Sequence, residues 1–348
     1  MRAHGWPALG LAVTALALAS AELFPAPARA CGGVFSRALR PEERRPSLSL
    51  EQTLIVHDAE AGREHFIREV AFRASRQPFG FVVPTPSQPE VRKVSQEPFS
   101  KLRSMYPFRS PLGGGEGTGQ GFGKGLGGAP RGGVRVLEVS KVGSFTAFVL
   151  AAEDAKGLAA WLAKHGLTSS PRHEEWLALY VKAKFFFVAM RYDPVANEDA
   201  EVGRTKSETV RLSFDTPLPF YPYREPDAGS EELEPRMIDL WLLSTRAHVP
   251  VSTRTSGGAP KWVRPFAEGF RYEAPRRADL ESALGADAKL LPTAAIQLQR
   301  FVDQKRSRHA FGDVVFVPAT RQTWNDKARA ELGPLMRVLD PKLLEGAR

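Results

Sequence analysis

The sequence predicts an α+β fold in which antiparallel or mixed β-sheets carry packed helices. The chain has 348 residues, of which 43% are hydrophobic and 25% are charged, and these fractions are typical of globular proteins. Apolar and polar residues alternate with a period of two over 210–214, as in a strand with one buried face. Apolar residues recur with helical spacing over 155–162. Because the chain has a single cysteine, burial rather than disulfides must stabilise this fold.

The first 30 residues have the features of a secretory signal peptide. A basic start precedes an apolar run over 8–19, and the small residues Ala28 and Ala30 stand at −3 and −1 before Cys31. The run is about 12 residues, whereas a membrane-spanning helix needs roughly 20. We therefore expect export, removal of residues 1–30, a periplasmic or extracellular location and no transmembrane span in the mature chain. The alternative is an uncleaved N-terminal anchor.

Cys31 has three chemical interpretations. Ala28 and Arg29 depart from a lipoprotein signal, which has an aliphatic residue at −3 and a small one at −2, and so they disfavour lipid attachment. Cleavage would leave an α-amine beside the thiol, and that amine could serve as the base of an N-terminal nucleophile in a hydrolase. The third interpretation is a thiol that stays free or pairs with another molecule.

The chain is basic, with a formal net charge of +9. Removal of residues 1–30, which hold two arginines and one glutamate, lowers this charge to +8. Basic and acidic residues are interspersed, as in 40–45 and 303–306, and this pattern indicates a solvated surface. A polyanion-binding surface protein is an alternative function, and we expect no nucleic-acid partner.

Residues 113–133 contain twelve glycines and almost no apolar side chains, which predicts a flexible glycine-rich loop inserted in the domain. Gly123, Gly125 and Gly128 fit G-x-G-x-x-G, yet the following segment 131–139 is strand-like, whereas a dinucleotide site needs a helix there. We expect no cofactor.

Before this loop, the sequence predicts strands over 52–58 and 79–83, and Pro84 ends the second because it supplies no amide to a sheet. The segment 64–74 has strand-like content, but its apolar residues would also suit one face of a helix, so periodicity leaves it ambiguous.

After the loop, 134–139 and 144–150 predict a hairpin. A helix follows, because Asp154 can cap its start and Gly166 can terminate it. The remaining expected elements are a short helix at 176–180, strands at 184–192, 210–214, 239–244 and 313–317, and surface helices at 293–306 and 326–339 in a helical C-terminal region.

Two aromatic runs raise the question of exposed contacts. A strand through 185–187 would send phenylalanines to both faces, and we expect burial in the chain's own core. Phe220, Tyr221 and Tyr223 lie between prolines in a predicted loop, and aromatic residues in rigid loops bind with little entropic cost. These three residues are the candidate contact surface.

Catalytic and metal-binding signatures are scarce. The sequence has no H-E-x-x-H or G-x-S-x-G motif, and one cysteine allows no thiolate zinc site. His57-Asp58 and Glu64-His65 flank a turn and could converge across a hairpin to hold a cation, but polar residues beside a turn are the ordinary explanation. We assign no catalytic and no metal-ligating residue.

An ordered set of segments resembles the bacterial family DUF2330, a domain of unknown function. These segments are C-G-G-V-F at 31–35, F-G-F-V-V-P-T-P at 79–86, V-G-S-F at 142–145, and the runs 158–166, 180–181, 186–189, 210–214 and 220–222. The resemblance covers about Cys31 to Leu243 and implies an exported bacterial protein with no established activity or cofactor. Ser36 stands where members often carry a second cysteine, which puts a short disulfide in doubt. The C-terminal membrane helix of some members is missing, which favours a soluble or lipid-linked form.

These patterns predict a signal peptide at 1–30, a DUF2330-like α+β domain at 31–250 and a partly helical C-terminal extension at 251–348. We expect an exported, non-catalytic binding or structural module, secreted or envelope-associated, whose partner is an envelope protein or a polysaccharide. The alternatives are a hydrolase with Cys31 as nucleophile and a polyanion-binding surface protein.

Overall fold

A computed structural model describes most of the chain between residues 33 and 319. The described residues are 33–36, 47–73, 79–107, 133–143, 145–192, 204–227, 236–253, 270–272, 275–305 and 308–319. The signal peptide expected at 1–30, the glycine-rich segment from 113 to 132 and the helix expected at 326–339 lie outside them.

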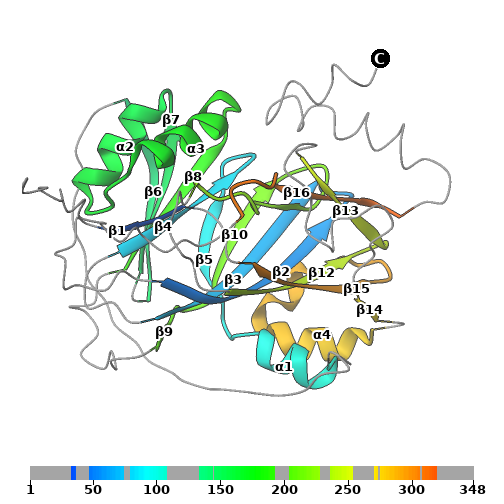
Figure 1. The fold of residues 1–348 in the computed structure, drawn as a ribbon. Helices are drawn as coiled ribbons and strands as arrows, with labels where there is room; N and C mark the ends of the chain where they lie inside the picture. The colour runs from blue at the N-terminus through cyan, green and yellow to red at the C-terminus, as the bar shows by residue number, and fades with distance from the viewer. Residues whose placement is uncertain are drawn as a thin grey trace, which may run out of the picture.

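The first sheet is antiparallel throughout, and its five strands have the order β1-β4-β8-β7-β6 (Figure 1). Their bounds are β1 Gly33–Ser36, β4 Phe79–Thr85, β8 Phe186–Tyr192, β7 Phe145–Ala152 and β6 Val134–Val142. The expected hairpin is confirmed as β6–β7, and it turns at Gly143, whose φ of 57° favours glycine. The strand expected at 79–83 is confirmed as β4, but Pro84 does not end it, because Pro84 and Thr85 continue the pairing with β8.

The second sheet is mixed and larger, with eight strands. Its order is β14-β15-β12-β2-β3-β10-β5, and β9 pairs with β3. The bounds are β14 Phe270–Tyr272, β15 Gln297–Lys305, β12 Arg236–Ser244, β2 Ser47–Asp58, β3 Arg63–Arg73, β10 Val210–Asp215, β5 Glu90–Lys93 and β9 Arg204–Lys206. Only β12 and β2 pair in parallel among these described strands. The ambiguous segment 64–74 is therefore a strand.

A third sheet of three strands has β16 between β11 and β13, and both pairings are antiparallel. The bounds are β11 Phe220–Tyr221, β16 Val314–Pro318 and β13 His248–Ser252. The described part of the C-terminal extension thus provides β16 to this sheet and β15 to the large sheet.

Helices cover both outer faces of the sheets (Figure 1). Their bounds are α1 Phe99–Met105, α2 Ala155–Lys164, α3 Pro171–Lys182, α4 Arg277–Leu284 and the 3₁₀ helix η3 Gly285–Leu290. The expected cap of α2 is confirmed, because Asp154 accepts a 2.6 Å hydrogen bond from the Gly157 amide. Among the described helices, none is long and apolar enough to cross a membrane.

Three apolar cores separate these layers because strand residues alternate between faces. On β4, Phe81 faces the core between the large sheet and the two smaller sheets, and Val82 faces the core beneath α2 and α3. On β2, Ile55 faces the inner core and Leu54 faces the core beneath α1 and α4. The result is an α+β fold in layers, in which α2 and α3 cover the small sheets, the small sheets pack on the large sheet, and α1 and α4 cover its other face.

One predicted element is wrong. The sequence predicts a surface helix over 293–306, but Gln297–Lys305 forms β15, which pairs with β12 and β14. Leu298 packs beneath the helices and Phe301 packs in the inner core. The strand was missed because its polar side chains, which suggest solvent exposure, are paired inside the protein.

Candidate functional site

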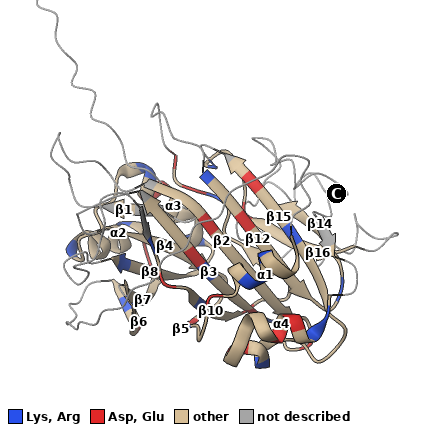
Figure 2. Cartoon of the chain, turned by 90° about the horizontal axis from the view of Figure 1, so that it is seen from below, with Lys and Arg blue, Asp and Glu red and all other residues tan. Residues whose placement is uncertain are grey.

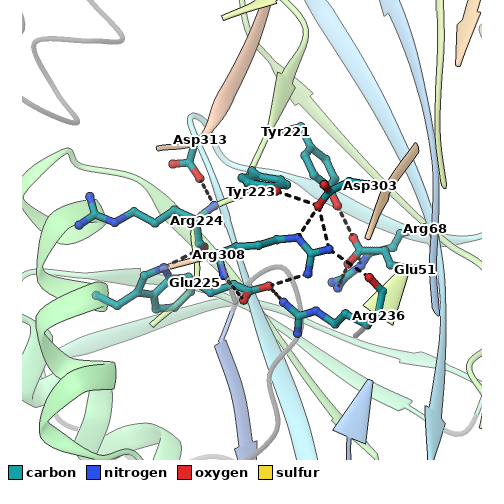
Figure 3. A network of polar contacts seen from close by, with 11 residues as sticks. Glu51, Arg68, Tyr221, Tyr223, Arg224, Glu225, Arg236, Asp303, Arg308 and Asp313 are labelled. Atoms are coloured by element: carbon teal, nitrogen blue, oxygen red, sulfur yellow. Dashed lines mark hydrogen bonds and ion pairs between the residues drawn. The ribbon is translucent and has the colours of Figure 1, made fainter. Parts of the chain in front are cut away.

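The candidate site is a network of charged and tyrosyl side chains in the core between the large sheet and the three-stranded sheet (Figure 3). Glu51 on β2 and Arg68 on β3 point to the same side as the apolar Ile55 and Phe66, because strand residues two and four apart share a face. The fold therefore carries charge into an otherwise apolar layer.

Glu51 and Arg68 form the first ion pair of the network. The Nε of Arg68 lies 2.9 Å from Oε1 of Glu51, and its Nη2 donates to Oε2 at 3.1 Å. The Tyr221 hydroxyl donates to Oε1 of Glu51 at 3.0 Å. The Arg68 guanidinium also lies 4.6 Å from the centroid of the Phe81 ring, which adds a cation–π contact across to the five-stranded sheet.

Asp303, Arg308, Glu225 and Arg236 form the second part of the network. Arg308 donates to Oδ2 of Asp303 from Nε at 3.1 Å and from Nη2 at 2.9 Å, and the Tyr223 hydroxyl donates to the same oxygen at 2.8 Å. The Nη1 of Arg308 lies 3.7 Å from Oε1 of Glu225, and Arg236 pairs with that oxygen. Arg308 is fully buried, with 0% of its side chain exposed.

The network balances three carboxylates against three guanidinium groups. Removing isolated charges from water costs several kcal/mol each, and mutual pairing with good hydrogen bonds offsets that penalty. The two tyrosines satisfy further carboxylate lone pairs. The arrangement joins β2 and β3 to the segments that flank β11 and β16, so it fixes the three-stranded sheet on the large sheet.

Asp313 extends the network toward α3. Its carboxylate accepts hydrogen bonds from the Tyr180 hydroxyl at 2.9 and 3.1 Å and from the Arg224 amide at 2.8 Å. Burial raises the pKa of Asp313 to about 6, against the opposing effect of those donors. Burial and the nearby Asp313 carboxylate also raise the pKa of Tyr180.

The shifted pKa of Asp313 predicts a specific pH dependence of stability. Because its folded pKa of about 6 exceeds its ordinary value of 3.8, its contribution is complete below pH 3.8 and is lost as pH rises through 6. Relative to Asp313→Asn, the wild type should lose about 3 kcal/mol of unfolding free energy over this range. Urea denaturation at several pH values measures the difference. The exposed Asp215→Asn is the control, and an equal dependence in both comparisons would contradict the prediction.

The predicted contact surface is wrong. Phe220, Tyr221 and Tyr223 are all fully buried. Phe220 packs in the core beneath α2 and α3, where its ring meets that of Phe185 at 5.8 Å, and the two tyrosines serve the charge network. The prolines around these residues predict a surface loop, but they flank a short strand enclosed by two cores. Burial of Phe185 is confirmed.

The other residues singled out from the sequence have different outcomes. Ala28, Ala30 and Cys31 lie outside the described residues. His57 and Glu64 do face each other across the β2–β3 hairpin. Within the described part of the chain, no group of three or more His, Cys, Asp or Glu side chains is placed to hold a metal ion.

Sequence reasoning missed the charge network. Its charged members are Glu51, Arg68, Glu225, Arg236, Asp303, Arg308 and Asp313. One signal was available, because a period of two puts Arg68 on the face of Phe66 and Val70. The pairing partners could not be found in this way, since Glu51 and Tyr221 are 170 positions apart.

Exposed charges pair with neighbours of opposite sign. Arg92 lies 2.7 Å from Glu90 and 3.3 Å from Glu138, and Lys93 lies 3.2 Å from Glu208. Figure 2 shows both signs of charge on the large sheet and its helices. The exposed pairs fit the solvated surface that the interspersed sequence pattern indicates, whereas part of the charge that Figure 2 draws on the large sheet is buried.

Comparison with known proteins gives one informative match. No curated protein matches the sequence. The crystal structure of baculovirus P35 aligns with 78% of this chain and 92% of its own chain, at 8% identity and a TM-score of 0.36, which is too weak a likeness to carry an argument. The family model described as "Uncharacterized protein conserved in bacteria (DUF2330)" matches residues 25–258. The chain therefore belongs to the bacterial family DUF2330.

Proposed function

We propose that this chain is an exported, non-catalytic binding or structural module that is secreted or associated with the cell envelope. The leader over residues 1–30 supports export, because it combines a basic start, an apolar run and small residues before Cys31. The partner that this proposal implies is an envelope protein or a polysaccharide.

The proposal that the protein is non-catalytic rests on one observation, which is that its buried carboxylates are paired with donors inside the protein. Glu51, Asp303 and Glu225 are each occupied by arginine or tyrosine donors within the protein, and their side chains are 0–5% exposed. A catalytic acid or base must come within about 3 Å of the proton that it transfers. Enclosed and mutually neutralised groups instead hold sheets together, which supports a structural role for the network.

The test of export and inactivity uses protein recovered from its native envelope or medium. We expect an intact mass that begins at Cys31, with one thiol that alkylates or with attached lipid. We also expect no turnover of ester, amide and glycoside substrate panels by this protein. Cys31→Ser is the matched variant, and it should leave the fold and the lack of turnover unchanged while it removes the alkylatable thiol or the attached lipid.

Two outcomes would overturn the proposal. A mass beginning at Met1 in the cytoplasmic fraction would remove the argument for export. Turnover of a substrate by the wild type that is lost in Cys31→Ser would show an N-terminal nucleophile and therefore a hydrolase.

A further inference from the structure

Side chains of the large sheet bond to backbone groups of the three-stranded sheet. Oε2 of Glu64, on β3, accepts a 2.7 Å hydrogen bond from the amide of Phe220 on β11. Gln299, on β15, accepts from the amide of His248 on β13 and donates to its carbonyl, both at 2.8 Å. These contacts lie in the same layer as the charge network, but no arginine takes part in them.

Glu64 and His57 are cross-strand partners at one end of this layer. They are paired in the β2–β3 register, their side chains share a face, and they are 0% and 1% exposed. Directly opposite residues of this kind have Cβ atoms about 4.5–5.5 Å apart. Oε1 of Glu64 and Nδ1 of His57 are both buried without a hydrogen-bond partner among the described residues.

The hydrogen bond at the other ring nitrogen fixes the protonation of His57. Nε2 lies 3.1 Å from the carbonyl oxygen of Thr216, and a carbonyl oxygen only accepts, so Nε2 carries the proton. In the neutral imidazole, Nδ1 is then an acceptor. Burial lowers the pKa of His57, which favours this neutral form.

Glu64 supplies the complementary group. Burial raises the pKa of its carboxyl well above the ordinary value, against the opposing effect of the Phe220 amide. Since Oε2 accepts from that amide, the proton of the neutral acid belongs on Oε1. A buried donor and a buried acceptor therefore lie on paired residues of one hairpin.

The titratable and charged groups near Glu64 and His57 are compatible with a neutral His57. Asp58, from the end of β2, raises the pKa of His57, and Arg246, which precedes β13, lowers it. On β13, burial and the nearby His57 lower the pKa of His248 to about 3. The imidazole rings of His57 and His248 are thus both neutral near pH 7.

We propose that Glu64 and His57 bind one internal water molecule, which accepts from the Glu64 carboxylic acid and donates to Nδ1 of His57. One water can bridge two buried polar atoms that have no partner among the described residues, and buried waters in proteins typically satisfy such groups. The water satisfies two buried atoms that would otherwise lose their hydrogen bonds to solvent without compensation.

The first test is a high-resolution crystal structure of the wild-type protein at pH 7, combined with infrared spectroscopy. We expect one water within hydrogen-bond distance of both Oε1 of Glu64 and Nδ1 of His57. The carbonyl stretch of a protonated carboxylic acid should be present in the wild type and in Glu60→Gln, an exposed change in the turn of the same hairpin, and should lose intensity in Glu64→Gln. A dry contact, or an unchanged acid band in a folded Glu64→Gln, would overturn the proposal.

The second test follows stability against pH in the same variants. A folded pKa above the ordinary value means that the stability contributed by Glu64 is present at low pH and is lost as pH rises through the folded pKa. The urea midpoint of the wild type should therefore fall relative to that of Glu64→Gln as pH rises above the ordinary carboxyl pKa of 4.5, whereas Glu60→Gln should follow the wild type. A constant difference, or one of opposite slope, would show an ionised Glu64. If Glu64→Gln does not fold, the wild-type crystal structure still decides the question.

Discussion

Replacing Arg308 with methionine should lower the free energy of unfolding by about 3–5 kcal/mol, because it leaves buried carboxylates without their counter-charge. Arg308 is the only residue that bonds both Asp303 and Glu225 among the described ion pairs, and none of its side chain is exposed. Methionine fills a similar volume, so the loss reports on charge rather than on a cavity. Since globular proteins are stable by about 5–15 kcal/mol, this loss is a large fraction of the total. Urea denaturation of the mature chain measures it.

The matched control for this substitution is an arginine at the surface. Arg172 on α3 is 47% exposed and lies 4.0 Å from Asp227, and pairs of this kind contribute about 0–1 kcal/mol. Arg172→Met should therefore be close to neutral. Adding Asp303→Asn to Arg308→Met should recover part of the loss, since it removes one uncompensated charge. Equal effects of the two arginine substitutions would contradict the structural role of the network.

Ending the chain at Gly258, where the family match ends, should abolish cooperative folding. The truncated chain lacks β15 and β16, and β16 is the strand that joins β11 to β13. It also lacks Asp303, Arg308 and Asp313, which pair with residues of the family region. The apolar residues of β16 at 314–317 are fully buried, so both cores on either side of it would be open. Circular dichroism during urea titration of residues 31–258 tests this expectation.

A chain that ends at Thr320 is the control for the truncation. It keeps all the strands and helices described here, and we expect it to unfold in one transition near the midpoint of the full chain. A cooperative transition of residues 31–258 at a similar midpoint would show that the family region folds without the C-terminal strands. Absence of a transition in both truncated chains would place the required residues beyond 320, which also contradicts the prediction.

The truncation tests whether the folded unit ends at residue 258, where the family match ends. Residues 259–319 follow the matched region, yet β15 pairs with β12 along its full length, from Gln297 to Lys305. Asp313 connects β16 to α3 through Tyr180. The folded unit of this protein therefore extends past the family match to β16.

The local patterns of the sequence predicted most elements that depend on nearby residues. Alternation over 210–214 identified β10, and Asp154 with Gly166 bounded α2. The apolar run at 79–83 identified β4. These predictions succeeded because period-two burial and helix capping depend on residues only a few positions apart in the sequence.

The tertiary structure alone decided the fate of polar and aromatic residues with distant partners. In β15, Arg300 pairs with Asp239 at 2.7 Å and Gln299 bonds His248, so a segment that looks solvent-exposed in sequence is a buried strand. Tyr221 and Tyr223 are enclosed because their hydroxyls have carboxylate partners on β2 and β15. A buried polar group is tolerated only when it is hydrogen-bonded or paired, and its partner here is tens to hundreds of residues away. Local patterns of the sequence therefore determined the elements whose burial or capping repeats within a few residues, whereas only the tertiary structure determined that Gln297–Lys305 is a strand and which charges lie inside.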